Sequence, residues 1–343
     1  MSGFDLSMEE LAARLAEWGE PAYRARQVYA QLWKRAADYE RMTDVSPALR
    51  ERLSREAPLD LEVLHEREAD GGATRKALLR LGRRHVVETV LMRYPDRVTV
   101  CISSQVGCAM DCSFCATGRM GLQGNLSAGE IAAQVVWARR AAGARRPTNV
   151  VFMGMGEPLA NYRPVRDAIA RLLDPAGMDL GARHVTVSTV GIVPGIRRLA
   201  RDHPQVGLAV SLHAADDALR DTLVPVNRRW PLDQLTHAVE EWRERTGRRP
   251  SIEWAMIDGV NDSNGQARLL VPIARRLGAH VNLIPMNPVA GAPMTGSPPA
   301  RIRRFVATLR DGGVNVTVRD TRGREIQAAC GQLRWEAAAS GLA

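Results

Sequence analysis

Residues 101–121 read CISSQVGCAMDCSFCATGRMG and carry four of the 5 cysteines in the chain. Three of them, Cys108, Cys112 and Cys115, are spaced as CxxxCxxC in a segment that also contains glycines, which allow the backbone to turn tightly. The apolar run RVTVCIS at residues 97–103 leads into this segment. The spacing therefore predicts a loop that follows a strand and brings three thiolates to one metal centre.

The number of thiolates restricts the kind of metal centre. A closed structural zinc site needs four ligands, so three leave one coordination position open, as in a catalytic zinc site or a 4Fe-4S cluster with one iron not bound by protein. We favour the cluster because no histidine lies nearby in the sequence to complete a zinc shell. Buried, inert thiols are a third interpretation. The odd cysteine count, without an export signal, argues against a disulfide scaffold.

A strand–helix alternation follows these cysteines. Parallel strands are predicted at RVTVCIS, NVVFMG, HVTVST, VGLAVSLH, SIEWAMI and HVNLIP, most of them followed by a helical stretch. Six such strands joined by right-handed crossovers favour an α/β fold, a partial (β/α)6 barrel rather than a doubly wound sheet. Chemistry in such barrels lies at the C-terminal strand ends. The polar residues expected there include Ser188 and Asn287, with residues 154–158 and 211–213.

Two smaller regions precede the barrel. Residues 1–58 predict a helical accessory domain, in which Ser7 and Glu10 form a capping box and prolines open further helices. Residues 59–96 alternate apolar and polar positions around a turn, which predicts a short antiparallel β connector. We assign the barrel and a C-terminal extension to residues 97–343.

Composition and charge exclude several classes of protein. Of the 343 residues, 45% are hydrophobic and 25% are charged, which is typical of globular proteins and excludes a disordered or coiled-coil chain. No apolar run reaches the roughly 18 residues that span a membrane, and the first ten residues lack a signal core, so we expect a cytoplasmic protein. The net charge of +9 favours a polyanionic partner, with nucleic acid first.

Five stretches of the sequence match one known family. They are CISSQVGCAMDCSFCATGRMG, GMGEPL at 154–159, SLHA at 211–214, NLIPMNP at 282–288 and RDTRGREIQAACGQL at 319–333. The chain, including its N-terminal module, resembles the RlmN family of radical S-adenosylmethionine (SAM) enzymes. The resemblance implies a radical SAM barrel that methylates carbon 2 of an adenine in the peptidyl-transferase centre of 23S rRNA. It also implies a second activity on the adenine beside the anticodon of some tRNAs.

The resemblance assigns a role to each matching residue. It implies a 4Fe-4S cluster on the cysteine triplet and two SAM molecules per turnover, in a site lined by Gly156, Glu157, Ser188, Ser211, Leu212, His213 and Asn287. Cys330 would carry the methyl group as a thioether. Cys101 would remove the substrate proton and resolve the protein–RNA adduct, through a transient Cys101–Cys330 disulfide. Glu88 would be a proton acceptor.

Partners and rival functions complete the expectation. The implied partners are 23S rRNA, tRNA and an electron donor such as flavodoxin, with the enzyme as a monomer. The rivals are a Cfr-type enzyme acting on carbon 8 of the same base, a non-catalytic iron–sulfur RNA-binding protein and a zinc-dependent RNA enzyme. Arginines are expected to contact RNA first at Arg319, Arg322 and Arg324, and then in the groups 139–140 with 145–146, 228–229, 248–249 and 301–304.

Overall fold

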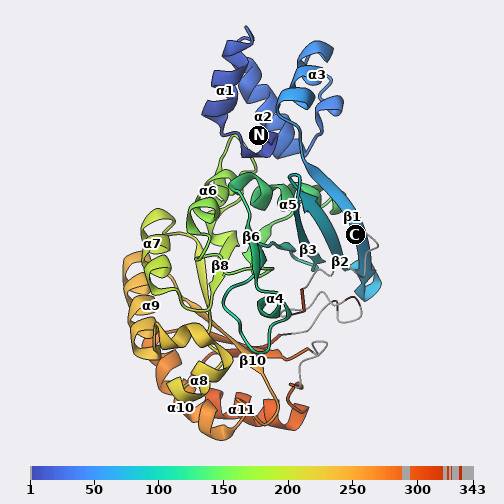
Figure 1. Cartoon of the computed structure of the whole chain (residues 1–343). Coiled ribbons are helices and arrows are strands. Elements are labelled where there is room, and N and C mark those ends of the chain that lie inside the picture. Colours follow the sequence, from blue (N-terminus) through green and yellow to red (C-terminus); the bar gives the residue numbers. More distant parts are fainter. Residues whose placement is uncertain (1, 288–293, 320–322, 324–325, 327–331, 334–343) are drawn as a thin grey trace.

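The computed structural model describes residues 2–287, 294–319, 323, 326 and 332–333. A lobe of N-terminal helices stands at one end of a curved sheet that carries helices on its outer face (Figure 1). The lobe contains α1 (Met8–Glu17), α2 (Tyr23–Arg35) and α3 (Pro47–Glu56). The helical character predicted for this region is therefore correct.

The predicted capping box is present at the start of α1. The Ser7 hydroxyl accepts from the Glu10 backbone N–H at 3.1 Å, and the Glu10 carboxylate accepts from the Ser7 N–H at 2.8 Å. An arginine of the barrel helix α6 (Tyr162–Leu173) contacts the N-terminal segment, because Arg171 donates to the carbonyls of Phe4 and Asp5. The guanidinium thereby supplies hydrogen bonds to backbone carbonyls at the end of a short helical segment.

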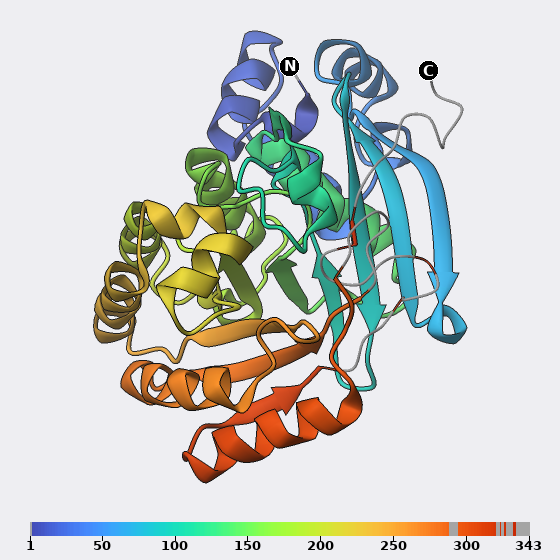
Figure 2. The ribbon, with the colours of Figure 1, turned by 60° about the horizontal axis from the view of Figure 1, so that its bottom comes forward.

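The antiparallel meander expected within residues 59–96 is formed by β1 (Leu61–Ala69), β2 (Thr74–Leu81) and β3 (His85–Arg93). It is more than a connector, because β3 pairs with the first barrel strand, β4 (Val98–Cys101), with Val90 opposite Cys101. The meander therefore extends the barrel sheet, and Figure 2 shows it at the opposite end from β12.

The barrel sheet has one more parallel strand than predicted. After β4 come β7 (Asn149–Phe152), β8 (Val185–Thr189), β9 (Gly207–Ser211), β10 (Ser251–Met256), β11 (His280–Pro285) and β12 (Val316–Val318), each parallel to its neighbour. The sequence predicts six, and the missed strand is β12. Its three residues are too short to show an alternating pattern. Within the described residues β12 pairs only with β11, so the barrel is open.

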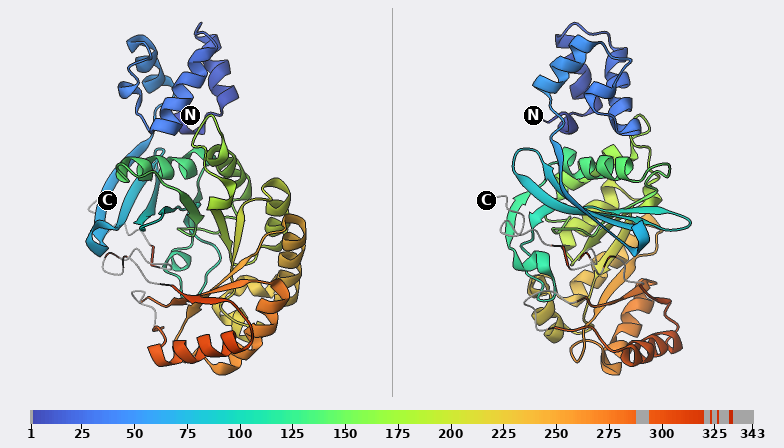
Figure 3. Two further views of the ribbon diagram at one scale, coloured as in Figure 1. Left: turned by 180° about the vertical axis from the view of Figure 1, so that it is seen from behind. Right: turned by 90° about the vertical axis from the view of Figure 1, so that its right-hand side faces the viewer.

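Helices cover the outer face of this sheet (Figure 3). They are α5 (Ala128–Ala141), α6 (Tyr162–Leu173), α7 (Val193–Asp202), α9 (Leu232–Thr246), α10 (Asn264–Leu277) and α11 (Pro299–Asp311). Shorter elements lie in the connections: α4 (Ala116–Arg119), α8 (Asp217–Leu223) and the hairpin of β5 (Gln105–Gly107) and β6 (Leu122–Asn125). Among the helices described here, none has the length and apolar character that crossing a membrane would require.

Candidate active site

A cleft of about 160 Å³ lies inside the barrel towards the C-terminal strand ends. Six of the seven residues predicted to bind SAM line it, together with two of the predicted cluster cysteines: Gly156, Glu157, Ser188, Ser211, His213, Asn287, Cys112 and Cys115. They come from five separate segments of the chain, which only the parallel barrel brings together. The seventh, Leu212, is buried beside the cleft, where its backbone N–H donates to the Glu253 carbonyl at 3.1 Å.

The cysteine loop, residues 108–115, is held at both ends by backbone hydrogen bonds. The Cys108 N–H donates to the Gly121 carbonyl at 3.0 Å, and the Ser113 N–H donates to the Leu223 carbonyl of α8 at 3.1 Å. Gly107 precedes the loop with a φ of +71°, and a Cβ there would lie 1.8 Å from the Gly121 oxygen. Only glycine fits this position, so the tight turn predicted from the glycines has a steric cause.

The thiols of this loop need a cation to ionise. Burial raises the pKa of Cys108 to about 12, and nearby Glu157 and Cys115 add to the increase. Burial also raises the pKa of Cys112, with further increases from Cys115 and Cys108. The three thiols thus lie close enough to repel one another as thiolates, and bound iron would supply the compensating positive charge.

A cluster and a single metal ion require different arrangements of their sulfur ligands. Across the part of the chain that the structure describes, no three His, Cys, Asp or Glu side chains are placed to hold a metal ion. In a 4Fe-4S cluster each thiolate binds a different iron, so the sulfurs stand apart around the cluster instead of meeting at one point. The cysteine loop is therefore compatible with a cluster.

The GMGEP turn, residues 154–158 after β7, packs directly on the segment that leads into the cysteine loop. The Gly154 N–H donates to the Ile102 carbonyl at 3.0 Å, and the Glu157 N–H donates to Gln105 Oε1 at 2.8 Å. Gly156 has a φ of +98°, and a Cβ there would come within 2.6 Å of Gln105 Cβ. This close approach fixes the turn relative to the cysteines.

Glu157 connects two strand ends through its buried carboxylate. Oε2 accepts from the Val190 N–H at 2.9 Å, and Oε1 accepts from the Leu159 N–H at 3.0 Å. Burial raises the pKa of Glu157 to about 7, although these hydrogen bonds lower it. The side chain therefore ties the GMGEP turn to the residues that follow β8.

His213 is a neutral side chain with a defined tautomer. Its Nδ1 accepts from the Ala255 backbone N–H at 3.0 Å, so the proton of the neutral ring is on Nε2. Burial, assisted by the charge of Arg220, lowers the pKa of His213 to about 3. The ring packs edge-on against Phe114 of the cysteine loop, with centroids 4.5 Å apart. His213 can thus act as a hydrogen-bond donor at neutral pH.

The side-chain amide of Asn287 could bind a polar ligand. It is buried in the cleft wall, yet neither its Nδ2 nor its Oδ1 has a hydrogen-bond partner among the described residues. Leaving such a group unpaired costs about 1–3 kcal/mol, which a bound polar ligand would recover. Ser188 of β8 and Ser211 of the adjacent strand β9 offer further hydroxyl groups, 3.3 Å apart.

Two charged side chains, Glu253 and Arg319, also line the cleft. Glu253 of β10 is buried there, accepts from Asn282 Nδ2 at 2.9 Å and has its other oxygen 3.7 Å from Arg319. The sequence analysis missed it because SIEWAMI was interpreted only as an apolar strand. A lone charge within such a strand was the available signal. Arg319, predicted to contact RNA, lines the same cleft.

Glu88 and Cys101 share one face of the meander sheet but do not line the cleft. Val90 lies opposite Cys101, and side chains alternate along β3, so Glu88 is on the same face as Cys101. Glu88 is buried in an ion pair with Lys76, with Nζ and Oε1 2.7 Å apart. The sequence analysis missed Lys76, because only the register of β2 and β3 brings the two together.

Cys330, Arg322 and Arg324 lie outside the described residues. Two nearby positions that the structure describes form hydrogen bonds with other parts of the chain. The Gly323 N–H donates to Asp70 Oδ2 of the meander at 3.0 Å, and Thr117 Oγ1 in α4 donates to the Leu333 carbonyl at 2.5 Å.

Comparisons with known proteins match both parts of the chain. Residues 102–268 match the radical SAM superfamily, and residues 4–59 match the ribosomal RNA large subunit methyltransferase N-terminal domain. The probable dual-specificity RNA methyltransferase RlmN of Salinispora arenicola is 53% identical, over 96% of this chain and 90% of its own. That of Chloroflexus aurantiacus is 50% identical, over 96% and 92%. The crystal structure of a radical SAM methyltransferase from Sphaerobacter thermophilus superposes with a TM-score of 0.96 at 50% identity, covering 98% of this chain and 100% of that one.

Proposed function

Because this chain belongs to the RlmN family of radical SAM RNA methyltransferases, we propose that it methylates carbon 2 of an adenine in the peptidyl-transferase centre of 23S rRNA. The observation that carries the proposal is the single cleft that joins the cysteine loop, the GMGEP turn and the end of β9. The dual specificity named in its relatives supports a second substrate, the adenine beside the anticodon in some tRNAs.

Radical SAM enzymes use a 4Fe-4S cluster and SAM. We assign the cluster to Cys108, Cys112 and Cys115, and the SAM site to Gly156, Glu157, Ser188, Ser211, Leu212, His213 and Asn287. Carbon 2 of adenine carries a non-acidic C–H, so it cannot be deprotonated and attack the methyl group of SAM as an ordinary nucleophile. When bound, the cluster and SAM supply the one-electron chemistry that such a carbon requires.

Cys330 is our candidate for the methyl-carrying thiol. It precedes Leu333 by three residues, a stretch that spans at most about 11 Å when fully extended. The Leu333 carbonyl binds Thr117, which is two residues beyond Cys115. The contact of Leu333 with Thr117 supports our assignment of Cys330 to this site.

Cys101 and Glu88 are our candidates for removing the proton from the methylated base and releasing the protein. They share one face of the sheet, and Lys76 places a positive charge beside Glu88. A cationic neighbour favours the ionised form of a carboxylate or thiol. Release by Cys101 would form a disulfide with Cys330, which a reductant must reopen.

The remaining partners extend the same proposal. The family acts on RNA, and the net charge of +9 suits that substrate. We propose a cytoplasmic monomer that receives electrons from a flavodoxin-like donor.

The decisive experiment is anaerobic reconstitution, followed by incubation with SAM, a reductant and an unmodified 23S rRNA fragment or tRNA. Mass spectrometry of the nucleosides should find 2-methyladenosine with the wild type and none with Cys330→Ala. In Cys101→Ala, RNA should remain covalently attached to the protein. A product methylated at carbon 8 would identify the Cfr-type activity. Absence of methylated adenine from a cluster-loaded wild type would leave the non-catalytic RNA-binding alternative.

A further inference from the structure

Arg220 of α8 is a fully buried arginine behind the SAM-lining end of β9. Its Nε donates to the Leu212 carbonyl at 3.0 Å, and its Nη2 donates to the Val190 carbonyl at 2.6 Å and the Ser211 carbonyl at 3.3 Å. Nη1 donates to Asn227 Oδ1 at 2.7 Å. One guanidinium thus holds together the chain beyond β8 and the end of β9.

The positive charge of Arg220 has no carboxylate in direct contact. In the described part of the chain no Asp or Glu oxygen forms an ion pair with it, and Asp217 and Asp221 instead accept from Asn227 Nδ2 at 2.9 and 2.7 Å. Burial lowers the pKa of Arg220 to about 10, which still leaves it charged at neutral pH. Asp217 and Asp221 raise the pKa of Arg220 without touching it, but a buried charge without a direct counterion is still costly, and a further anion nearby would stabilise it.

The cysteine loop is where that anion would form. The Ser113 N–H bonds to the Leu223 carbonyl, so the loop packs on the helix that carries Arg220. Cys112 also belongs to the same buried apolar cluster as Leu223 of this helix. Three thiolates bound to an iron–sulfur core give that centre a net negative charge, which the guanidinium would offset.

We propose that Arg220 is a positioning residue with two roles: its fork fixes the SAM-lining ends of β8 and β9, and its buried charge stabilises the reduced cluster on the cysteine loop. This inference rests on the assignments of Cys112 and Ser211 in the proposed function. Reduction adds an electron to a centre near a fixed cation, so Arg220 raises the reduction potential.

Two substitutions separate the roles. Arg220→Lys keeps the charge but cannot reproduce four bonds from a planar fork, whereas Arg220→Met removes both. The control is Arg228→Met, which removes the same charge from an exposed position eight residues away. Each anaerobically reconstituted protein is examined by a redox titration followed by electron paramagnetic resonance and by calorimetric titration with SAM, without RNA.

We expect Arg220→Met to shift the reduction equilibrium at least about tenfold towards the oxidised cluster, which corresponds to about 59 mV for one electron. Arg220→Lys should keep a potential close to that of the wild type but bind SAM at least about tenfold more weakly. Arg228→Met should match the wild type in both. If Arg220→Met does not fold, the loss of SAM affinity in Arg220→Lys still tests the fork.

Contrary outcomes are distinct. A wild-type potential in Arg220→Met, or wild-type SAM affinity in Arg220→Lys, would overturn the corresponding role of Arg220. A shift of equal size in Arg228→Met would show a general charge effect and also overturn the inference. A wild type that holds no cluster or binds no SAM would instead contradict the site assignments under the proposed function.

Discussion

Asn287 and Asn161 are both buried asparagines, but their side chains do different work. Asn161 Nδ2 donates to the carbonyls of Ser104 and Leu126 at 2.9 and 2.8 Å, while the amide of Asn287 has no partner among the described residues. We predict that Asn287→Ala weakens SAM binding by about 1–3 kcal/mol with little change in stability. Asn161→Ala should lower stability. Calorimetric SAM titration and thermal unfolding check both, and unchanged SAM affinity in Asn287→Ala would exclude it from the site.

At the scale of the element, the β5–β6 hairpin sets the shape of the cysteine loop. Gly107 and Gly121 both have positive φ, but a Cβ on Gly107 would meet a backbone oxygen while one on Gly121 would meet nothing within 4 Å. We predict that Gly107→Ala reconstitutes with less than about half of the wild-type iron, because the hairpin must open to avoid the clash. Gly121→Ala carries only the conformational penalty and should load normally. Equal iron contents in the two variants would refute this explanation.

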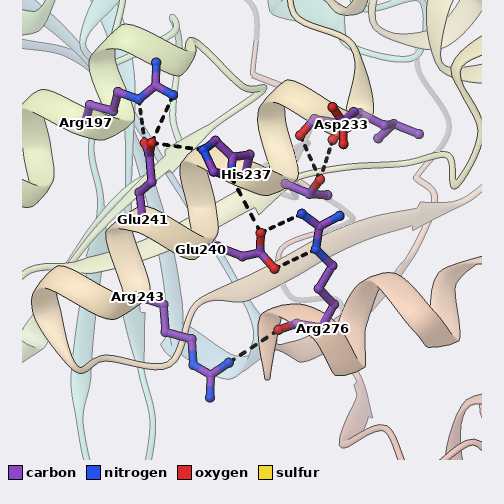
Figure 4. Close-up of polar contacts among 9 residues, drawn as sticks. Arg197, Asp233, His237, Glu240, Glu241, Arg243 and Arg276 are labelled. Carbon is purple, nitrogen blue, oxygen red and sulfur yellow. Dashed lines mark hydrogen bonds and ion pairs between the residues drawn. The ribbon is translucent and has the colours of Figure 1, made fainter.

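Ion pairs on the molecular surface join neighbouring outer helices (Figure 4). Glu241 of α9 binds Arg197 of α7 with two contacts of 2.5 and 3.3 Å, and the hydrogen bond to Arg197 lowers the pKa of Glu241. Both side chains are largely exposed, so solvent screens the pair. Its contribution to stability is present above the ordinary carboxyl pKa and disappears as pH falls through the lowered value.

We therefore predict that Glu241→Gln lowers the free energy of unfolding at pH 7 by at most about 1 kcal/mol. The difference from the wild type should vanish as pH falls through the lowered pKa of Glu241, and it should shrink in about 1 M salt. Glu244→Gln on the same helix removes an exposed carboxylate that has no ion pair among the described residues and should have no effect. Thermal unfolding at several pH values tests this, and a difference that persists once the carboxylate is protonated would contradict it.

Across the whole molecule, features encoded by local spacing were predictable and features encoded by long-range packing were not. The cysteine triplet, the GMGEP turn and most parallel strands follow from motifs or periodicity within a few residues. Lys76 meets Glu88 only through strand register, and Arg220 resembles a solvated helix residue until the barrel closes over it. β12 was missed because three residues carry too little pattern, although its pairing with β11 is regular.

A second pocket, separate from the cleft, contains arginines that could bind RNA. A pocket of about 520 Å³ lies between the end of α5 and the starts of β7 and β8, on the barrel face opposite the cleft, and includes Arg139 and Arg146. Burial, and then the like charge of Arg146, lowers the pKa of Arg139. Neither arginine forms an ion pair within the described residues. The neighbouring Arg140 donates to the Ala36 carbonyl at 2.8 Å, so the pocket adjoins the N-terminal helices.

Two repelling guanidinium groups in a pocket suit a phosphate, and we predict that they bind the RNA backbone. Replacing both with Gln should weaken RNA binding and reduce the slope of log affinity against log salt by about 1.4–1.8, as expected for two lost phosphate contacts. Arg198→Gln with Arg268→Gln removes the same charge from exposed positions on α7 and α10 and should change the slope far less. Fluorescence anisotropy with a labelled 23S rRNA fragment measures both slopes. Equal slopes for the two double variants would mean that net charge alone, without this pocket, accounts for the binding.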